Sequence, residues 1–278
     1  MKNKYKISFI GGGNMATALI GGLAGTVTDG ANIHVVDIND AALQKLAQQF
    51  GVTTSNTIDA AISHSDVVVL AVKPQQMQQI VSALLPYMKG QLILSIAAGI
   101  GSEDLSRWLN GHDAIVRCMP NTPALIGKGI TGMVATNGVS VQQRDTADLI
   151  MRAVGATVWL DDEALIDSVT AVSGSGPAYV FYFIEAMQQA AQELGLTPEQ
   201  GNALAIATFV GASQLAAQSS EPVSVLRERV TSKGGTTYAA LNSLEASGVK
   251  AAIVAAAKAA AVRGKELGEE FGQVSPKE

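Results

Sequence analysis

The stretch that decides the fold lies near the amino terminus, where residues 7–16 read ISFIGGGNMA. It matches the pattern G-x-G-x-x-G/A through Gly11, Gly13 and Ala16, directly after an apolar run. In that pattern the first glycine permits a tight turn and the second lets the backbone approach a pyrophosphate. The small third residue keeps the following helix close to the strand. The stretch therefore predicts a strand, a turn and a helix that together bind a dinucleotide.

The elements around this stretch support the interpretation. A helix is expected over residues 15–23, and a second strand over 33–36 runs directly into Asp37. An acidic residue about twenty positions past the glycine pattern is placed to bind the adenosine ribose; the alternative for Asp37 alone is a turn or capping residue. Asn14 and Met15 begin the helix, whose free amides and dipole favour an anion. We therefore count them as cofactor-binding.

Up to about residue 160, short β-branched runs alternate with helix-like segments. Strands are expected at 7–10, 33–36, 67–72, 92–96, 114–119, 132–136 and 157–160, and helices between them at 41–50, 75–88 and 141–153. Nearly continuous apolar character is typical of parallel strands covered on both faces. The βαβ alternation predicts an α/β fold with a doubly wound Rossmann sheet.

After residue 161 the strands stop, and alanine-rich helices are expected over 178–194, 198–218 and 251–271. We therefore expect an NAD(P)-binding Rossmann domain over 1–160 and an all-α domain over 161–278. Residues 251–261 are very apolar for a helix near a chain end. Packing within the chain would account for them, but the helical part is small for its apolar content. We expect a subunit interface there.

Composition excludes several classes of protein. The 278 residues are 47% hydrophobic and 15% charged, which is too apolar for a disordered chain. A formal net charge of −5 argues against a nucleic-acid partner. No apolar stretch reaches the roughly twenty residues of a membrane helix, and the basic residues 1–6 lead into a strand and not a signal core. We expect a cytoplasmic protein with a small-molecule substrate and no membrane partner.

The single cysteine and the histidines offer little chemistry. Cys118 ends an apolar strand, which favours a place in the core over a nucleophile, and one cysteine forms no internal disulfide. His34, His64 and His112 are isolated in the sequence. We therefore expect no metal site.

Ligands of an open α/β sheet collect at the carboxyl ends of the strands. Small or proline-containing loops follow three of the expected strands there, at residues 71–74, 95–99 and 119–123. Each loop alone is an ordinary turn, but together they would line one crevice, where Lys73 or Asn121 could bind the nicotinamide ribose or amide. The residues that we count as cofactor contacts are Ala71, Val72, Lys73, Ala97 and Ala98.

Two further segments combine hydroxyls with glycines ahead of expected helices. Residues 173–179 read SGSGPAY and residues 231–237 read TSKGGTT. Amides and hydroxyls at a helix start form a natural cradle for a carboxylate, and ordinary helix capping explains the pattern equally well.

Together these loops resemble the 1-pyrroline-5-carboxylate reductase family, which carries out the last step of proline biosynthesis. The resemblance rests on residues 9–16, 71–74, 95–99, 117–123, 173–179 and 232–237. It implies an N-terminal Rossmann domain, a C-terminal helical dimerisation domain, and a homodimer or larger homo-oligomer. It also implies NADP or NAD as cofactor, 1-pyrroline-5-carboxylate as substrate and L-proline as product.

The resemblance also implies roles for single residues. It places the substrate at residues 232–237, with Thr237 as the catalytic residue at the ring nitrogen, and it makes Asn56 a cofactor contact. The substrate-binding residues that it implies are Glu163, Ser232, Gly235, Thr236 and Thr237.

The sequence departs from the family pattern at two positions. Lys233 stands where the family commonly has proline, and Asp37, with no arginine after it, would repel the 2′-phosphate of NADPH. The preference between NADH and NADPH therefore stays open. One rival is a β-hydroxyacid dehydrogenase or imine reductase, but Lys250 and Lys258 lack the motif of its helix lysine. The other is a redox sensor that binds the dinucleotide without turnover.

Overall fold

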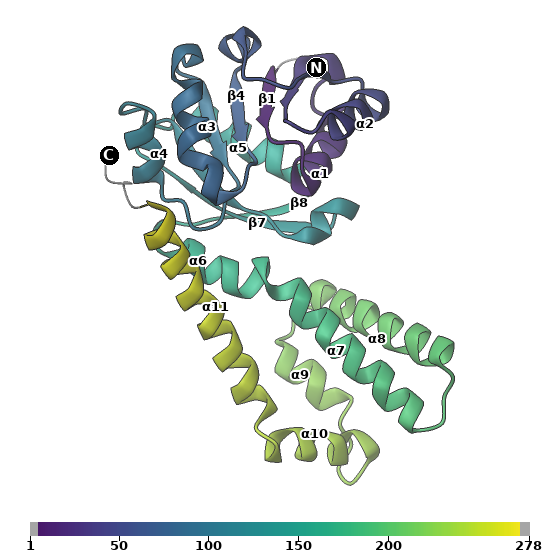
Figure 1. Cartoon of the computed structure of the whole chain (residues 1–278). Helices are drawn as coiled ribbons and strands as arrows, with labels where there is room; N and C mark the ends of the chain where they lie inside the picture. The colour runs from purple at the N-terminus through teal and green to yellow at the C-terminus, as the bar shows by residue number, and fades with distance from the viewer. Residues whose placement is uncertain (1–4, 273–278) are drawn as a thin grey trace. The chain divides into compact units, whose positions relative to one another are not determined.

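Figure 1 shows the computed structural model, which describes residues 5–272. Four residues of the basic amino-terminal segment, 1–4, and the carboxyl-terminal residues 273–278 lie outside the described part. The chain forms two compact units. The first runs to Ser175 and resumes at Ala260, and the second spans Gly176–Ala259.

The first unit is built on one eight-stranded sheet of the order β3-β2-β1-β4-β5-β6-β7-β8. The strands are β1 (Ile7–Ile10), β2 (Ile33–Val36), β3 (Thr53–Ser55), β4 (Val67–Leu70), β5 (Leu92–Ser95), β6 (Ile115–Met119), β7 (Gly129–Ala135) and β8 (Gly155–Trp159). Strands β1 to β6 are parallel, β7 is antiparallel to β6, and β8 is parallel to β7. Because β1 lies between β2 and β4, the strand order reverses beside the glycine turn, where such sheets bind ligands.

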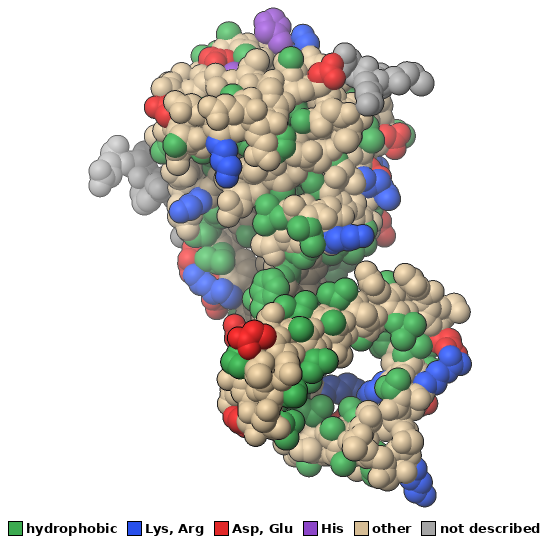
Figure 2. Space-filling model, turned by 90° about the vertical axis from the view of Figure 1, so that its right-hand side faces the viewer, with side chains coloured by type: hydrophobic (Ala, Val, Ile, Leu, Met, Phe, Trp, Pro, Cys, Tyr) green, Lys and Arg blue, Asp and Glu red, His purple; other side chains and the backbone are tan. Residues whose placement is uncertain are grey.

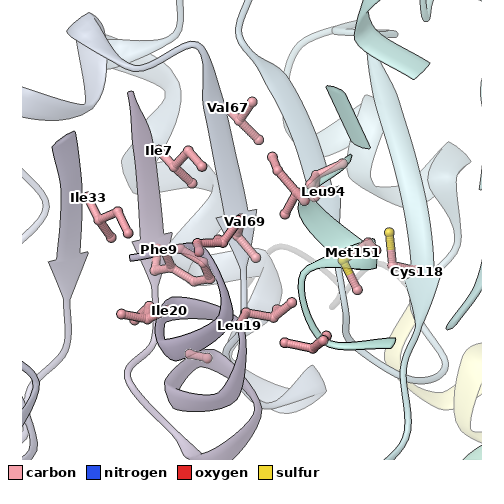
Figure 3. Packing of buried hydrophobic residues seen from close by; sticks show 14 of the residues in the cluster. Ile7, Phe9, Leu19, Ile20, Ile33, Val67, Val69, Leu94, Cys118 and Met151 are labelled. Carbon is pink, nitrogen blue, oxygen red and sulfur yellow. The ribbon is translucent and has the colours of Figure 1, made fainter. Parts of the chain in front are cut away.

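Helices cover both faces of this sheet. They are α1 (Asn14–Leu23), α2 (Asp40–Phe50), α3 (Met77–Leu84), α4 (Ser102–Trp108), α5 (Val141–Arg152) and α6 (Leu165–Val169). Phe9 and Val69 pack with α1, α2 and α5 on one face, whereas Ile10 and Leu70 pack with α3 and α4 on the other. Figure 3 shows part of the first cluster, in which Phe9 is fully buried. Burying such a side chain contributes about 1.5–3 kcal/mol to the stability of the fold. The strand that precedes the glycine turn is therefore firmly packed in the core.

The expected doubly wound sheet followed by helices is confirmed, with differences at element ends. Strand β3 was not expected, because its polar sequence TTS gives no apolar run. The helix expected over 75–88 is interrupted: 3₁₀ turns at Pro74–Gln76 and Leu85–Tyr87 flank α3. Pro86 accounts for the carboxyl-terminal end, because proline has no amide hydrogen to donate to the α-helical ladder.

The second unit is helical, with α7 (Gly176–Glu193), α8 (Pro198–Gln218), α9 (Val223–Arg229), α10 (Thr236–Ala246) and the first part of α11 (Val249–Gly272). Helices α7 and α8 approach closely, because a Cβ added at Gly201 would lie 3.0 Å from the Cβ of Ala191. Within α7, α9 and α10 no described residue is buried. This unit therefore has almost no core of its own.

The boundaries of the two compact units differ from the boundary expected near residue 160, where the strands give way to helices. Helix α6 and the last part of α11 belong to the first unit. The division into domains 1–160 and 161–278 stays a prediction. None of the helices in residues 5–272 is long and apolar enough to cross a bilayer.

Candidate active site

The glycine turn joins β1 to α1 with little room to spare. Gly11 has a φ of +104°, and a Cβ there would lie 2.6 Å from the carbonyl oxygen of Ala71. Only glycine fits such a position. Gly13 is different, because a Cβ there would meet no protein atom within 4 Å. The protein itself gives no reason for a glycine at Gly13, whereas a ligand lying against the backbone would.

The start of α1 has unpaired hydrogen-bonding capacity. Gly13 is the N-cap residue and offers no side chain, and Asn14 behind it is exposed. The first amides of a helix have no partner within the helix, and their dipole favours negative charge. The geometry fits the pyrophosphate of a dinucleotide.

Asp37 lies at the end of β2 and is held firmly. Its Oδ2 accepts a hydrogen bond from the Gly12 amide at 2.6 Å, and its Oδ1 accepts one from the Asn39 amide at 2.8 Å. It lines a cavity of about 480 Å³ together with Gly11, Asn56 and apolar side chains. A mainly apolar hollow with a few polar groups is typical of a small-molecule site. The structure thus brings Asp37 and Asn56 together beside the glycine turn.

The loops after β4 and β5 lie at the same edge of the sheet. The Ala71 amide donates to the carbonyl of Ile10, the last residue of β1, and the Ile96 amide donates to Leu70, the last residue of β4. Ala71 and Val72 are half-buried and Ala97 is buried. Of these residues, Val72 lines the cavity that also holds Gly11 and Asp37. Lys73 is exposed and begins the 3₁₀ turn ahead of α3.

Asn121 makes hydrogen bonds within the protein through both groups of its amide. Its Nδ2 donates to the Ser173 carbonyl at 3.2 Å, and its Oδ1 accepts from the Ile130 amide at 3.0 Å. The side chain is buried and ties the loop after β6 to β7 and to the segment before α7. A contact between Asn121 and the nicotinamide stays a prediction.

Glu163 lies in a cluster that the sequence reasoning missed. Its carboxylate accepts hydrogen bonds from the amide (2.7 Å) and hydroxyl of Ser102, and from Arg117 Nη1 at 2.5 Å. Arg117 is buried in the middle of β6. Burial raises the pKa of Glu163, but the bonds from Ser102 and the charge of Arg117 outweigh it and hold the pKa below its usual value. The signal was a charged residue inside an apolar strand, which needs a partner.

The segment 231–237, in the second unit, forms a tight turn at the start of α10. The Gly235 amide donates to the Ser232 carbonyl at 3.0 Å, and Gly234 has a φ of +74°. A positive φ at the third residue is the mark of a type II turn, in which the second position, here Lys233, is the usual place of proline. Lysine in place of proline therefore leaves this turn intact.

Helix α10 begins without a side-chain cap. Gly235 is its N-cap residue, and the first bond within the helix runs from the Ala239 amide to the Gly235 carbonyl at 3.1 Å. The amides of Thr236 and Thr237 belong to the first turn and have no carbonyl partner within the helix. The side chain of Thr237 is half-buried at the same start. The arrangement is suited to a small carboxylate.

The segment 173–179 covers the end of a π-helical stretch and the start of α7. A π-helical stretch, Thr170–Gly174, links α6 to α7, and the Ser175 amide donates to the Thr170 carbonyl at 2.8 Å. Helix α7 begins at Gly176, inside the segment, and the Ser175 amide ahead of it is paired and not free for a ligand. Single π turns often lie at functional sites.

Cys118 is buried, and burial raises the pKa of its thiol against the smaller opposing effect of Arg117. A buried thiol of raised pKa is an inert core residue. The expectation that Cys118 belongs to the core is confirmed.

Two family models match this chain. The model described as pyrroline-5-carboxylate reductase dimerisation matches residues 163–267, and the model described as NADP oxidoreductase, coenzyme F420-dependent, matches residues 6–99. Both fall on segments whose geometry is described above.

Relatives match along the whole chain. A pyrroline-5-carboxylate reductase of Pseudomonas aeruginosa is 46% identical over 96% of this chain and 98% of its own length. The structure of a pyrroline-5-carboxylate reductase from Coxiella burnetii superimposes with a TM-score of 0.89, at 39% identity over 95% of this chain and 99% of that one. The structure of the Plasmodium falciparum pyrroline carboxylate reductase, with NADP bound, superimposes with a TM-score of 0.86. Its identity is 28%, over 96% of this chain and 100% of that one. This chain belongs to the pyrroline-5-carboxylate reductase family.

Proposed function

We propose that this chain reduces the C=N bond of 1-pyrroline-5-carboxylate to give L-proline, using NADH or NADPH. The observation that carries the proposal is the open start of α10, where the turn 232–237 presents glycine, amides and threonine hydroxyls without a side-chain cap. Membership of the reductase family along the whole chain supports the same substrate.

The cofactor would lie along the carboxyl edge of the sheet. Gly11 and Gly13 with the amides of Asn14 and Met15 would hold the pyrophosphate. Asp37 and Asn56, in the wall of the cavity, would bind the adenosine. The nicotinamide half would lie against Ala71, Val72, Lys73, Ala97 and Ala98.

The substrate carboxylate would bind at the start of α10. The amides of Gly235 and Thr236 and the Ser232 hydroxyl would orient it, and the Thr237 hydroxyl would hold the ring nitrogen, which gains a proton. A bound dihydronicotinamide supplies the hydride that reduces the imine carbon. The protein forms no covalent bond to the substrate and acts mainly by positioning it.

Glu163 would act on this site indirectly. The family resemblance implies a substrate contact for it, yet its oxygens already accept bonds from Ser102 and Arg117. We therefore propose that Glu163 mainly positions the first turn of α4, next to the loop after β5, with about one acceptor position left for the substrate.

We also propose a homodimer or larger homo-oligomer. The second unit carries many exposed apolar side chains, among them Phe181 (59% exposed), Tyr182 (70%) and Leu215 (58%). Figure 2 shows such side chains in green over its helices. Exposed apolar surface of this kind marks an interface between proteins, and the dimerisation model covers these residues.

We also propose that the protein works in the cytoplasm, where other dehydrogenases regenerate the reduced dinucleotide that a reductase consumes. The net charge of −5 favours small-molecule partners over nucleic acid.

The direct test is an assay of the purified full chain. We expect oxidation of reduced dinucleotide that depends on 1-pyrroline-5-carboxylate, with one L-proline formed for each dinucleotide oxidised. Oxidation supported instead by a keto acid, with no reaction of the cyclic imine, would favour a hydroxyacid dehydrogenase. Binding of the dinucleotide with no turnover of either substrate would favour a sensor.

A further inference from the structure

We propose that Asp37 makes this enzyme selective for NADH over NADPH. The inference rests on the proposed function, because it concerns the cofactor of the same site. It starts from the place of Asp37 at the end of β2, where the 2′-hydroxyl of an adenosine ribose lies in a Rossmann fold.

The carboxylate of Asp37 cannot swing away from this position without losing two hydrogen bonds. Its Oδ2 is 2.6 Å from the Gly12 amide, and its Oδ1 is 2.8 Å from the Asn39 amide. Hydrogen bonds to an ionised acceptor are short and about twice as strong as neutral ones. The negative charge is therefore fixed at the edge of the adenosine cavity.

A fixed carboxylate treats the two cofactors differently. A carboxylate has about four acceptor positions, so Asp37 can still accept bonds from the ribose hydroxyls of NADH. In NADPH a 2′-phosphate replaces the ribose hydroxyl that would donate to Asp37. The phosphate has only acceptor oxygens and carries a charge of about −1.5 to −2. Like charges side by side without a counter-ion are strongly unfavourable.

The surrounding residues supply no counter-ion. Among the residues that the structure describes, no lysine or arginine lines this cavity. The residues that follow Asp37 are Ile38, Asn39 and Asp40, which add a further negative charge. A site that accepts a 2′-phosphate usually provides an arginine here.

The test measures binding without substrate, so that it stands apart from turnover. NADH and NADPH are titrated into the wild-type full chain by calorimetry, followed by 5′-AMP and adenosine 2′,5′-bisphosphate, which isolate the 2′-phosphate. We expect NADH to bind on the order of 10- to 100-fold more tightly than NADPH, with the same order for the two adenosine nucleotides. Equal binding, or tighter binding of NADPH, would overturn the proposal.

Two variants locate the cause. Asp37→Ser removes the charge, and the NADH:NADPH affinity ratio should fall to about threefold or less. Asp29→Asn removes one charge at the other end of β2, ahead of Ile33, and should leave the ratio unchanged. A ratio that persists in Asp37→Ser, or collapses equally in Asp29→Asn, would contradict the role of Asp37.

The outcomes separate this proposal from the proposed function. Selective binding of NADH without reduction of 1-pyrroline-5-carboxylate would refute the function and leave the role of Asp37 standing. Reduction of the imine with NADPH at least as efficient as with NADH would refute the selectivity and leave the function standing. Failure to bind either dinucleotide would refute both.

Discussion

Helices α5 and α8 begin with a side-chain cap on their first amides, whereas α1 and α10 begin without one. In α5 the Ser140 hydroxyl accepts from the Gln143 amide, and the Gln143 side chain accepts from the Ser140 amide. Thr197 and Gln200 form the same reciprocal pair at α8. Such capping boxes satisfy amides that a helix leaves free.

Helices α1 and α10 begin instead with a glycine, Gly13 and Gly235, and no side chain caps them. One open start belongs to each unit of the chain. Serine or threonine thus closes the starts of α5 and α8, and Asn39 closes that of α2 by accepting from the Ala42 amide. Where a ligand is expected, the amides are left for it.

Helix α4 is a third case that lies between the two. It also begins after a glycine, Gly101, but the Ser102 amide donates to Glu163, which is 61 residues away in the sequence. The protein thus closes this start from a distance. An open start in the local sequence is therefore a ligand site only when no distant residue fills it.

The largest effect should come from filling the open start of α1. Gly13→Val should weaken dinucleotide binding on the order of 100-fold, or about 2.7 kcal/mol, because the side chain occupies space that the pyrophosphate needs. Its melting temperature should hardly change, since the backbone there is extended (φ −71°, ψ −174°) and no protein atom lies within 4 Å. Titration measures the dinucleotide affinity, and thermal unfolding measures the melting temperature. Gly13→Ala should give a smaller loss, and unchanged affinity in both variants would refute a ligand at this start.

At the open start of α10, Thr237→Ala should lower kcat by up to about 100-fold and leave dinucleotide affinity nearly intact. The reason is the loss of one hydroxyl beside the ring nitrogen of the substrate. The matched variant Thr237→Ser keeps the hydroxyl and should recover most of the activity. Steady-state kinetics measures both variants. Turnover equal to wild type in Thr237→Ala would remove its proposed role.

The distant cap of α4 should matter for stability. Glu163→Gln should lower the free energy of unfolding by about 2 kcal/mol at neutral pH, because it leaves the buried Arg117 without its partner charge. Urea unfolding measures this. Glu266→Gln, which removes a carboxylate from an exposed pair with Arg263, should change little.

The pH dependence of this effect has a definite sign. The pKa of Glu163 is lowered in the folded chain, so its contribution is fully present above the unfolded value of about 4.3. The contribution is lost as the pH falls through the folded pKa. The stability difference between wild type and Glu163→Gln should therefore narrow under acid conditions. A constant difference from neutral pH to the acid range would contradict the ion pair.

Opening the closed starts should affect only stability. Ser140→Ala and Thr197→Ala should each cost about 1 kcal/mol of unfolding free energy, because each removes a cap. Denaturant titration measures the loss, and dinucleotide affinity should stay at the wild-type value. A loss of dinucleotide affinity in Ser140→Ala would contradict the assignment of the α5 start as purely structural.

The smallest effect concerns the turn before α10. Lys233→Pro should raise the unfolding free energy by about 0.4–1 kcal/mol, because proline suits the second position of a type II turn and restricts the unfolded chain. Thermal unfolding and kcat together check it. Destabilisation would show that the turn is of another type.

Much of the first unit follows from local sequence. Buried parallel strands read as apolar runs, and the glycine pattern after β1 locates the cofactor edge. The substrate segment 232–237 was identified by resemblance, and its type II turn became evident only from Gly234 and the bond between Gly235 and Ser232.

Other features depend on contacts that no local pattern records. The ion pair of Arg117 and Glu163 joins residues 46 positions apart. The π turn at Thr170–Gly174 changes a helix without a distinctive composition. The polar strand β3 exists because it pairs with β2 at the sheet edge. In each case tertiary contacts decide what the local sequence leaves open.

Hydrogen exchange of the full chain tests the account most directly. NADH should slow exchange in the peptide that covers residues 11–16, and L-proline added with NAD⁺ should slow it in residues 232–238. The capped starts at Gln143 and Gln200 should exchange at the same rate with and without ligand. Absence of protection at residues 11–16 and 232–238 would contradict the claim that the open starts of α1 and α10 are the binding sites. Equal protection of the capped starts by the ligands would contradict it as well.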